Sequence, residues 1–341
     1  MTTASRPIFA LAAAALLLAA CGDKPAAAVA KACLIPPASS AAPATTGMVL
    51  VKGGRFAMGA RPMLPEEGPP AETTVGDFWI DRTEVTNADF ARFVKATGYV
   101  TLAERPLDPR LYPDLPPQAL RPSALVFVGA ADVGDGDPSR WWRVVEGANW
   151  RRPLGPGSSI AGKETQPVVQ IAWEDAMAYA RWLGRDLPTE AEWEYAAQGG
   201  KAATRYVWGD APLDPDKPQA NVWQGAFPGL DTGGDGYRAQ TAPVGCFPAN
   251  GFGLHDMAGN VWEWTRDAYA ERSRAPETAP ETADEPRDPN PRAHVIKGGS
   301  FLCAPNYCYR YRPAARQPGP VDGGENHIGF RTVLRITPSG A

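Results

Sequence analysis

Proline and glycine interrupt this chain throughout its length, which limits how much regular structure it can form. Its 341 residues include 36 prolines and 35 glycines, both well above ordinary usage. Proline breaks helices and central strands, and glycine favours turns. The accompanying 11 Trp, 10 Tyr and 11 Phe exclude a disordered chain. We expect a compact core with much turn and loop, either as two average domains or as one large irregular domain.

Charge and missing motifs exclude several classes of function. The formal net charge is -4, so there is no basic excess to attract nucleic acid. The sequence contains no G-x-S-x-G, Walker A or dinucleotide-binding fingerprint, which removes the hydrolase, nucleotide and nicotinamide interpretations. No closely spaced cysteine triplet for an iron–sulfur cluster occurs either.

Residues 1–20 have the form of a signal peptide. Arg6 precedes an apolar run from Ile8 to Ala20 that is too short to span a bilayer permanently. The run ends in LAAC, which resembles the lipobox of bacterial lipoproteins, where the cysteine, here Cys21, is lipidated and becomes the mature first residue. An ordinary signal peptide followed by a chance cysteine is the alternative.

We therefore expect an exported, membrane-anchored lipoprotein on the periplasmic side. Gly22 gives no inner-membrane retention signal, which favours the outer membrane. Export also places the remaining cysteines in an oxidising compartment.

A tether and a folded part follow the predicted signal peptide. Residues 21–46 are mostly Ala, Pro, Ser and Thr, a composition typical of a tether, and Cys33 within it is expected to have no function. Folded sequence is expected over 47–337. Within it, residues 270–291 are acidic and Pro-rich and should form a solvent-exposed loop.

The first elements can be placed by pattern and capping signals. MVLVKGGRFAMGA, from Met48, alternates around a glycine pair as a strand and a bend would. The segment FWIDRTEVTNADFARFVKATGY should form a strand that runs into a helix. Thr86 should cap this helix, with Asp89 three residues later, and the helix should end near Gly98.

Two more short helices and two strands are expected further along. One helix should run from about Glu174 to Leu183, after a buried strand PVVQIAW. The other begins at Thr189, where TEAE fits a capping box. NHIGFRTVLRI should form a last strand.

The segment 101–165 shows little periodicity and reads as a long loop. Its tryptophans, Trp141, Trp142 and Trp150, can be interpreted in two ways. Together with nearby arginines they would form one wall of a binding groove, or they belong to the core.

The segment 199–267 is dense in turns that carry carboxylates, amides and free carbonyls. Such oxygens are the ligands of calcium, although Asp and Asn are also ordinary turn formers and no EF-hand loop is present. The three histidines, His255, His294 and His327, are spread out with no metal-ligand spacing, so we expect them to be structural.

Chemistry is most concentrated in residues 298–316, GGSFLCAPNYCYRYRPAAR. Cys303 and Cys308 are separated by Pro305, so they must meet through a turn that aims both sulfurs at one point. The pair can form a structural disulfide, or a redox or Cu(I) site, or remain as bystanders. Cys246 could pair with either thiol. The flanking tyrosines and arginines exceed what a structural disulfide requires.

These motifs resemble the formylglycine-generating enzyme family, copper-dependent oxidases that convert a sulfatase cysteine to Cα-formylglycine. The resemblance extends from Met48 to Ile336. It is carried by MVLVKGGRFAMG, EVTNADFARFV, GPGSSI, RDLPTEAEWEYAA, GLHDMAGNVWEW, GGSFLCAPNYCYRYR and GFR. The cysteine pair within GGSFLCAPNYCYRYR distinguishes the oxidases from relatives that share only the scaffold.

The resemblance implies an α+β fold: a single irregular domain related to C-type lectins, low in regular structure and supported by calcium. The first implied calcium site comprises Asn221, Asp235 and the carbonyls of Val222 and Tyr237. The second comprises Asp256, Glu263 and the carbonyls of Gly259 and Val261.

The resemblance also implies a mechanism. Cys303 and Cys308 would bind Cu(I) as a dithiolate, and the thiolate of an unfolded sulfatase polypeptide, within a Cys-x-Pro-x-Arg motif, would join as third ligand. O2 is the oxidant and a thiol supplies reducing equivalents. Ser300, Tyr307 and Asn326 match positions that line this site.

Two features depart from the family pattern or qualify it. Pro313 stands where many relatives have a further cysteine, so that disulfide is expected to be absent. Export to an oxidising compartment conflicts with a reduced copper site. The competing interpretation is a lipoprotein of the same scaffold that binds a peptide or glycan without catalysis. A relative of iron-dependent sulfoxide synthases would need a histidine cluster that this chain lacks.

Overall fold

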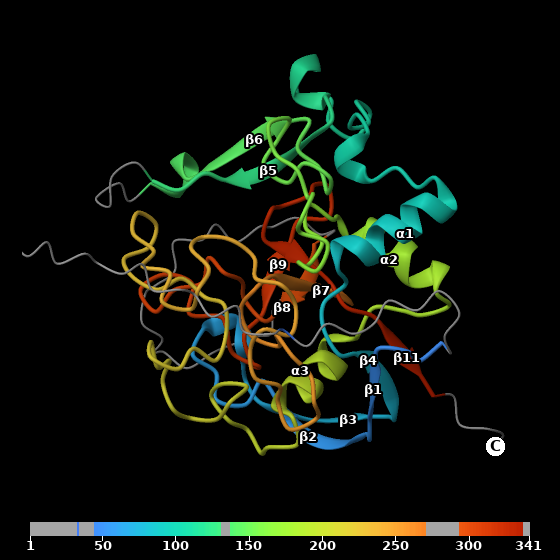
Figure 1. Ribbon diagram of the computed structural model, residues 1–341. Helices are drawn as coiled ribbons and strands as arrows, with labels where there is room; N and C mark the ends of the chain where they lie inside the picture. The colour runs from blue at the N-terminus through green and yellow to red at the C-terminus, as the bar shows by residue number, and fades with distance from the viewer. Residues whose placement is uncertain (1–32, 34–43, 131–136, 271–292, 337–341) are drawn as a thin grey trace, which may run out of the picture. The chain divides into compact units, whose positions relative to one another are not determined.

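The computed structural model describes residue 33 and residues 44–130, 137–270 and 293–336 (Figure 1). The predicted signal peptide, the lipidation site Cys21, most of the predicted tether and nearly all of the acidic loop lie outside these residues. Within the described part, no helix is long and apolar enough to cross a membrane.

Strands in the described residues form four small sheets (Figure 1). A three-stranded antiparallel sheet has the order β1-β4-β11, and a mixed four-stranded sheet has the order β10-β7-β8-β9. Two hairpins, β2-β3 and β5-β6, complete the set. The bounds are β1 Met48–Val51, β2 Gly54–Met58, β3 Ala71–Val75, β4 Phe78–Asp81, β5 Ser123–Phe127, β6 Trp142–Glu146, β7 Trp262–Ala268, β8 His294–Lys297, β9 Gln317–Gly319, β10 Ile328–Gly329 and β11 Val333–Arg335.

Two of the three α-helices in the described residues, α1 and α3, confirm the capping predictions. Helix α1 (Asn87–Thr97) has Thr86 as N-cap in a reciprocal capping box with Asp89, and ends at Gly98 in a left-handed conformation. The other two helices are α2 (Trp173–Trp182) and α3 (Glu190–Gln198), the latter capped by Thr189 and Glu192. Short 3₁₀ turns are η1 Pro65–Glu67, η2 Leu102–Glu104, η3 Pro117–Leu120 and η4 Pro138–Arg140.

Three predictions about strands and loops were wrong. The segment 101–165 was predicted as a loop but contains the β5-β6 hairpin. The connection between these two strands is long, so the sequence contains no tight-turn motif that would indicate a hairpin. Residues 167–172 of PVVQIAW are buried but form no strand, because Gln170 has a positive φ of 61°, which is incompatible with regular strand pairing. NHIGFRTVLRI forms two strands in different sheets, since Arg331 between them turns inward to Glu263.

The main core joins helices α1 and α2 to the sheets through aromatic packing. Phe90 of α1 lies at its centre, with ring centroids 5.3 Å from Trp150 and 6.0 Å from Tyr179. Phe330 contacts both Phe90 and Tyr179. This core also includes Cys303, Cys308 and Tyr311, so the candidate site is packed against the body of the domain. Trp150 is therefore a core residue.

Cys33 is not without function, contrary to the prediction. It forms a disulfide with Cys246, across a sequence separation of 213 residues. The pair packs with Ala242, Phe247 and Tyr237, and the Tyr237 hydroxyl lies 3.4 Å from the Cys246 sulfur. The disulfide could not be predicted from the residues around Cys33, because its partner is far away in the sequence. The bond also decides the pairing of Cys246, which the sequence left open.

A buried carboxylate holds the start of α2 against the chain that follows α1. Asp175 is fully buried and accepts hydrogen bonds from the amides of Ala172 and Leu102 and from the Tyr99 hydroxyl, each at 3.0 Å. Burial raises the pKa of Asp175 to about 7, and these hydrogen bonds only partly oppose the rise.

The stability difference between the wild type and Asp175→Asn should therefore depend on pH. The folded-state pKa lies above the unfolded value, so the contribution of Asp175 is fully present below about pH 4 and is lost as pH rises through about 7. We expect the wild type to lose on the order of 2–4 kcal/mol relative to the variant between pH 4 and pH 8, since each pKa unit corresponds to about 1.4 kcal/mol. Urea unfolding of both proteins across this range measures it. A constant difference would contradict the prediction.

Candidate active site

The loop from Gly298 to Arg316 leaves strand β8 through two glycines in left-handed conformations, with φ of 93° and 71°. A Cβ on Gly299 would lie 3.0 Å from the backbone nitrogen of Tyr311. Glycine is therefore needed here for the two arms of the loop to lie side by side. The close approach fixes the turn that carries both cysteines.

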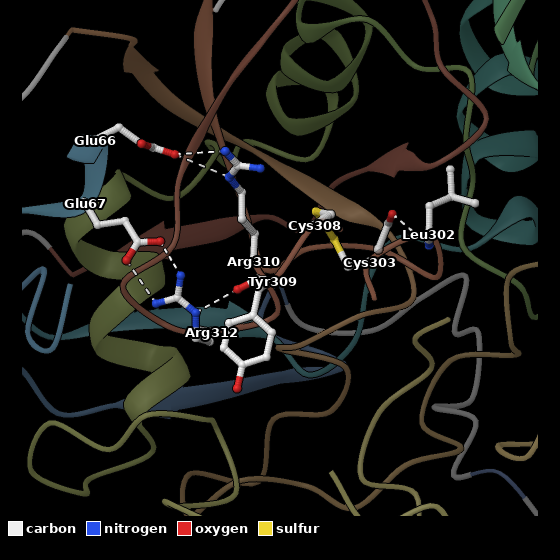
Figure 2. The surroundings of a disulfide bond; sticks show 9 residues. Glu66, Glu67, Leu302, Cys303, Cys308, Tyr309, Arg310 and Arg312 are labelled. Carbon is white, nitrogen blue, oxygen red and sulfur yellow. Dashed lines mark hydrogen bonds and ion pairs between the residues drawn. A yellow bond between two sulfur atoms is a disulfide. The ribbon is translucent and has the colours of Figure 1, made fainter. Parts of the chain in front are cut away.

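Cys303 and Cys308 meet, as the sequence predicted. Both are buried, their Cα atoms are 4.5 Å apart, and the sulfurs are joined as a disulfide (Figure 2). The Cys303 amide donates to the Ser300 carbonyl at 3.0 Å, and the Cys303 carbonyl accepts from the Trp223 amide at 3.0 Å. In the reduced form, two thiols held this close can share one soft metal ion.

The three other predicted site residues lie around this loop at different depths. Ser300 is fully buried, and its hydroxyl accepts from the Leu302 amide at 3.2 Å. Tyr307 stacks on Phe227 with ring centroids 4.3 Å apart. The side-chain oxygen of Asn326 accepts a hydrogen bond from the Phe127 amide at 2.9 Å. It supports the aromatic cluster described next.

An aromatic cluster that the sequence did not predict packs on the Cys303 side of the loop. Its buried members are Phe127, Trp141, Trp223, Phe227, Phe301, Leu302 and Ala304, with Trp142 and Tyr307 partly exposed. These side chains come from distant segments, so only the Trp residues gave any signal. Trp141 and Trp142 thus lie beside the cysteine loop. The buried members of the cluster keep water from this side of the loop, and its partly exposed aromatic side chains are Trp142 and Tyr307.

The Cys308 side is held differently, by ion pairs to η1. Arg312 donates to both carboxylate oxygens of Glu67, one of them at 2.9 Å, and Arg310 donates to Glu66 at 3.0 Å (Figure 2). The Nε of Arg312 also donates to the Tyr309 carbonyl at 2.7 Å. Neither ion pair was predicted from the sequence.

The first predicted calcium set is brought together. Asp235 accepts from the amides of Val222 at 3.2 Å and Tyr237 at 2.9 Å, which places Asn221 beside it. The side-chain oxygen of Asn221 is buried and has no hydrogen-bond partner among the described residues. Burial raises the pKa of Asp235 to about 6, and the charge of Asp231 adds to this. An oxygen-rich, buried site of this kind fits a hard cation.

The second predicted set is only partly arranged for a cation. One carboxylate oxygen of Asp256 is buried and without a partner among the described residues, as is one oxygen of Glu84, which the prediction did not include. Both oxygens of Glu263 instead accept from Arg331 at 2.6 Å, and one also accepts from Trp193 at 2.8 Å. The ligand role of Glu263 stays a prediction.

The histidines take structural positions within the described residues. His255 bonds through Nδ1 to the Phe247 carbonyl at 2.8 Å, and His294 stacks on Trp173. His327 is buried against Trp142, and burial lowers its pKa to about 3. No group of three or more His, Cys, Asp or Glu side chains suited to a metal ion occurs in the described part of the chain.

Comparison with known proteins identifies the scaffold. Residues 36–336 match the family model described as the sulfatase-modifying factor enzyme 1-like domain. The chain belongs to this family. A formylglycine-generating enzyme from Mycobacterium tuberculosis is 52% identical over 294 residues, which cover 84% of this chain and 97% of that protein. The α+β fold expected for the family is confirmed.

The chain is also similar to a relative that is named as inactive and to a solved structure. An inactive Cα-formylglycine-generating enzyme 2 from Bos taurus is 38% identical, covering 84% of this chain and 87% of that protein. The solved structure of PvdO from Pseudomonas aeruginosa has 27% identity and a TM-score of 0.53, covering 85% of this chain and 94% of that one. Family membership alone therefore does not establish catalysis.

Proposed function

We propose that this protein converts a cysteine of an unfolded sulfatase, within a Cys-x-Pro-x-Arg motif, into Cα-formylglycine, with Cu(I) held by Cys303 and Cys308. The observation that carries the proposal is the buried, converging cysteine pair. It lies in a chain that is 52% identical to an enzyme of that name. Two thiols with no histidine or carboxylate beside them in this loop suit a soft monovalent ion.

The net reaction defines what the site must supply. The substrate –CH₂–SH and O₂ react with two electrons and two protons, taken from a thiol reductant, to give an aldehyde, H₂S and water. When bound, copper supplies the place where O₂ is activated. In the reduced form, the thiolates of Cys303 and Cys308 would hold this ion and favour its monovalent state, and the substrate thiolate would join them.

The surrounding residues bind the substrate and exclude water. Trp142 and Tyr307, the partly exposed aromatic residues of this cluster, would offer apolar contact beside the pair. The buried rings of Trp141 and Phe227 pack against Tyr307 and hold it in place. The Ser300 hydroxyl lies inside the loop, where it holds the Leu302 amide. A dry site strengthens the electrostatic contacts that orient a charged thiolate.

Mass spectrometry of a candidate peptide tests the proposal. Reduced, copper-loaded protein should convert peptides with the Cys-x-Pro-x-Arg motif aerobically, with the mass loss of thiol-to-aldehyde conversion. Peptides with Ser in place of that Cys serve as controls. Absence of turnover on several such peptides by protein with stoichiometric copper would sink the proposal.

The alternative is a binding module without catalysis. It is favoured by the disulfide state of Cys303 and Cys308 and by the existence of an inactive relative. In this alternative, the aromatic cluster would contribute to binding a peptide or glycan, which would be released without chemical change. Tight binding of the peptide without any mass change would support it.

We further propose calcium at the two buried oxygen-rich sites, as a structural ion. Chelation should then lower the melting temperature, and added calcium should restore it, because an ion that binds only the folded state stabilises it by mass action. At a calcium concentration about 100 times the Kd, the gain is ~2.7 kcal/mol.

Asn221→Ala and Asp235→Asn should each reduce this calcium-dependent gain. Asp216→Asn, on an exposed turn of the same region, is the matched control and should keep the full gain. Differential scanning calorimetry with and without calcium measures the effect. Equal melting temperatures in chelator and calcium would contradict the calcium proposal.

We also propose that the protein is an exported lipoprotein attached through Cys21, on the periplasmic side and in the outer membrane. The Cys33–Cys246 disulfide supports export, since such bonds persist in oxidising compartments. Metabolic labelling with a clickable fatty acid, compared with Cys21→Ser, tests the attachment.

A further inference from the structure

The chain that follows Cys308 is held by charges that come from the other end of the sequence. Residues Tyr309 to Arg312 form the outgoing arm of the cysteine loop. Arg312 and Glu67 are a fully buried pair, with side chains 1% and 0% exposed, and are separated by 245 residues in sequence. Arg310 and Glu66 form a second pair beside it, 11% and 17% exposed.

These contacts fix the backbone close to Cys308 and leave Cys303 to other supports. Besides its bond to Glu67, Arg312 reaches back to the Tyr309 carbonyl, the residue next to Cys308 (Figure 2). Glu67 itself is held by the Met63 amide at 2.7 Å. Cys303 is anchored through Trp223 instead. The two sulfurs are therefore positioned by independent parts of the domain.

We propose that Glu66 and Glu67 are positioning residues for the thiol pair. Through Arg310 and Arg312 they hold the arm after Cys308, and so set how strongly the pair binds a soft monovalent ion and how stable its disulfide is. The effect on metal affinity rests on the proposed function, whereas the effect on disulfide stability does not.

Both properties depend on one quantity, the effective concentration of one thiol at the other. If the arm moves more freely, the disulfide is harder to form and the two-thiolate metal site is weaker. Loss of a glutamate also leaves an arginine charge uncompensated near Cys308, which favours the thiolate over the disulfide. The two effects on the disulfide act in the same direction.

The test uses the full-length protein and two measurements. Metal-free protein is equilibrated in glutathione redox buffers, and alkylation with mass spectrometry reports the Cys303–Cys308 disulfide separately from Cys33–Cys246. Cu(I) affinity is measured by competition with a chromophoric Cu(I) chelator. In Glu67→Gln the disulfide equilibrium should shift toward the dithiol, and Cu(I) affinity should fall, each by about tenfold, as for other residues that support ligands.

Arg312→Lys separates geometry from charge. Lysine keeps the positive charge but loses the planar fork that bonds Glu67 and Tyr309 together. It should shift both equilibria in the same direction as Glu67→Gln. Glu66→Gln changes a partly exposed pair, so it should fold well and show a smaller shift, about threefold.

Asp81→Asn is the matched control. It breaks the ion pair between Asp81 and Arg185, whose side chains are 16% and 9% exposed, respectively. Neither residue belongs to the cysteine loop or to the glutamate pair that holds it. It should lower thermal stability and leave both thiol equilibria unchanged.

Unchanged equilibria in Glu67→Gln, Arg312→Lys and Glu66→Gln would overturn the proposal, whatever happens to the melting temperature. If the wild type binds no Cu(I) but the disulfide equilibrium shifts, the proposed oxidase fails and the positioning role stands.

Discussion

Replacing either Cys303 or Cys308 with serine should abolish Cu(I) binding and formylglycine formation. A hydroxyl is a poor ligand for a soft monovalent ion, so one remaining thiolate cannot form the site. We expect a loss of activity greater than the roughly 10–100-fold typical of changes to residues that only support a ligand. Mass spectrometry of the peptide and Cu(I) titration measure the two effects.

The fold should survive these substitutions. The sequence separation of the two cysteines is only 5, so their disulfide closes a short loop and removes little entropy from the unfolded chain. The double variant Cys33→Ser/Cys246→Ser is the matched control: it should lose about 2–4 kcal/mol of stability and keep its Cu(I) site. Residual turnover in both single variants of the site would show that the pair is not the metal centre.

Replacing Arg331 with methionine should cause the largest loss of stability. Arg331 is fully buried and donates two hydrogen bonds to Glu263 at 2.6 Å and one to the His255 carbonyl at 3.0 Å. Without it, the buried carboxylates of Glu263, Glu84 and Asp256 lose their nearest buried cation. Breaking such a buried pair costs about 3–5 kcal/mol. Urea unfolding at pH 7 measures the loss.

Arg266→Met is the comparison for Arg331→Met. Its partner Asp186 is shared with Arg335, and the Arg266 side chain is 56% exposed, so we expect a loss of about 1 kcal/mol or less. A loss of similar size in the two variants would mean that burial of Arg331 is not what makes it important. Added calcium should recover part of the loss in Arg331→Met if Asp256 binds the ion.

Local signals made the helices predictable. The capping boxes of Thr86 with Asp89 and of Thr189 with Glu192 lie within four residues of sequence, and each was found. The cysteine pair was found for the same reason, since its spacing and its neighbours are contiguous. The spacing alone left open whether the pair is a structural disulfide or a redox or copper site. Family resemblance then supplied the proposed function.

Long-range contacts were not predictable in this way. The β5-β6 hairpin is closed by residues 128–141, too long a connection for a turn signal. The aromatic cluster packs Phe127, Trp223 and Phe227 against residues of the cysteine loop. The Glu67–Arg312 ion pair joins residues that are 245 positions apart in the sequence. In each case the sequence contains ordinary residues whose meaning depends on a distant partner. Such pairings follow from topology, which local patterns do not specify.

The disulfide between Cys33 and Cys246 occupies the two thiols that could otherwise pair with Cys303 and Cys308. If Cys21 is lipidated, four thiols remain, and four cysteines allow three pairings. Only the pairing that joins Cys33 to Cys246 keeps Cys303 and Cys308 as partners of each other. Either of the other two would bind both site cysteines to distant thiols. If the Cys33–Cys246 bond closes early in oxidative folding, Cys303 and Cys308 can pair only with each other. The site pair would then remain available for reduction and metal binding.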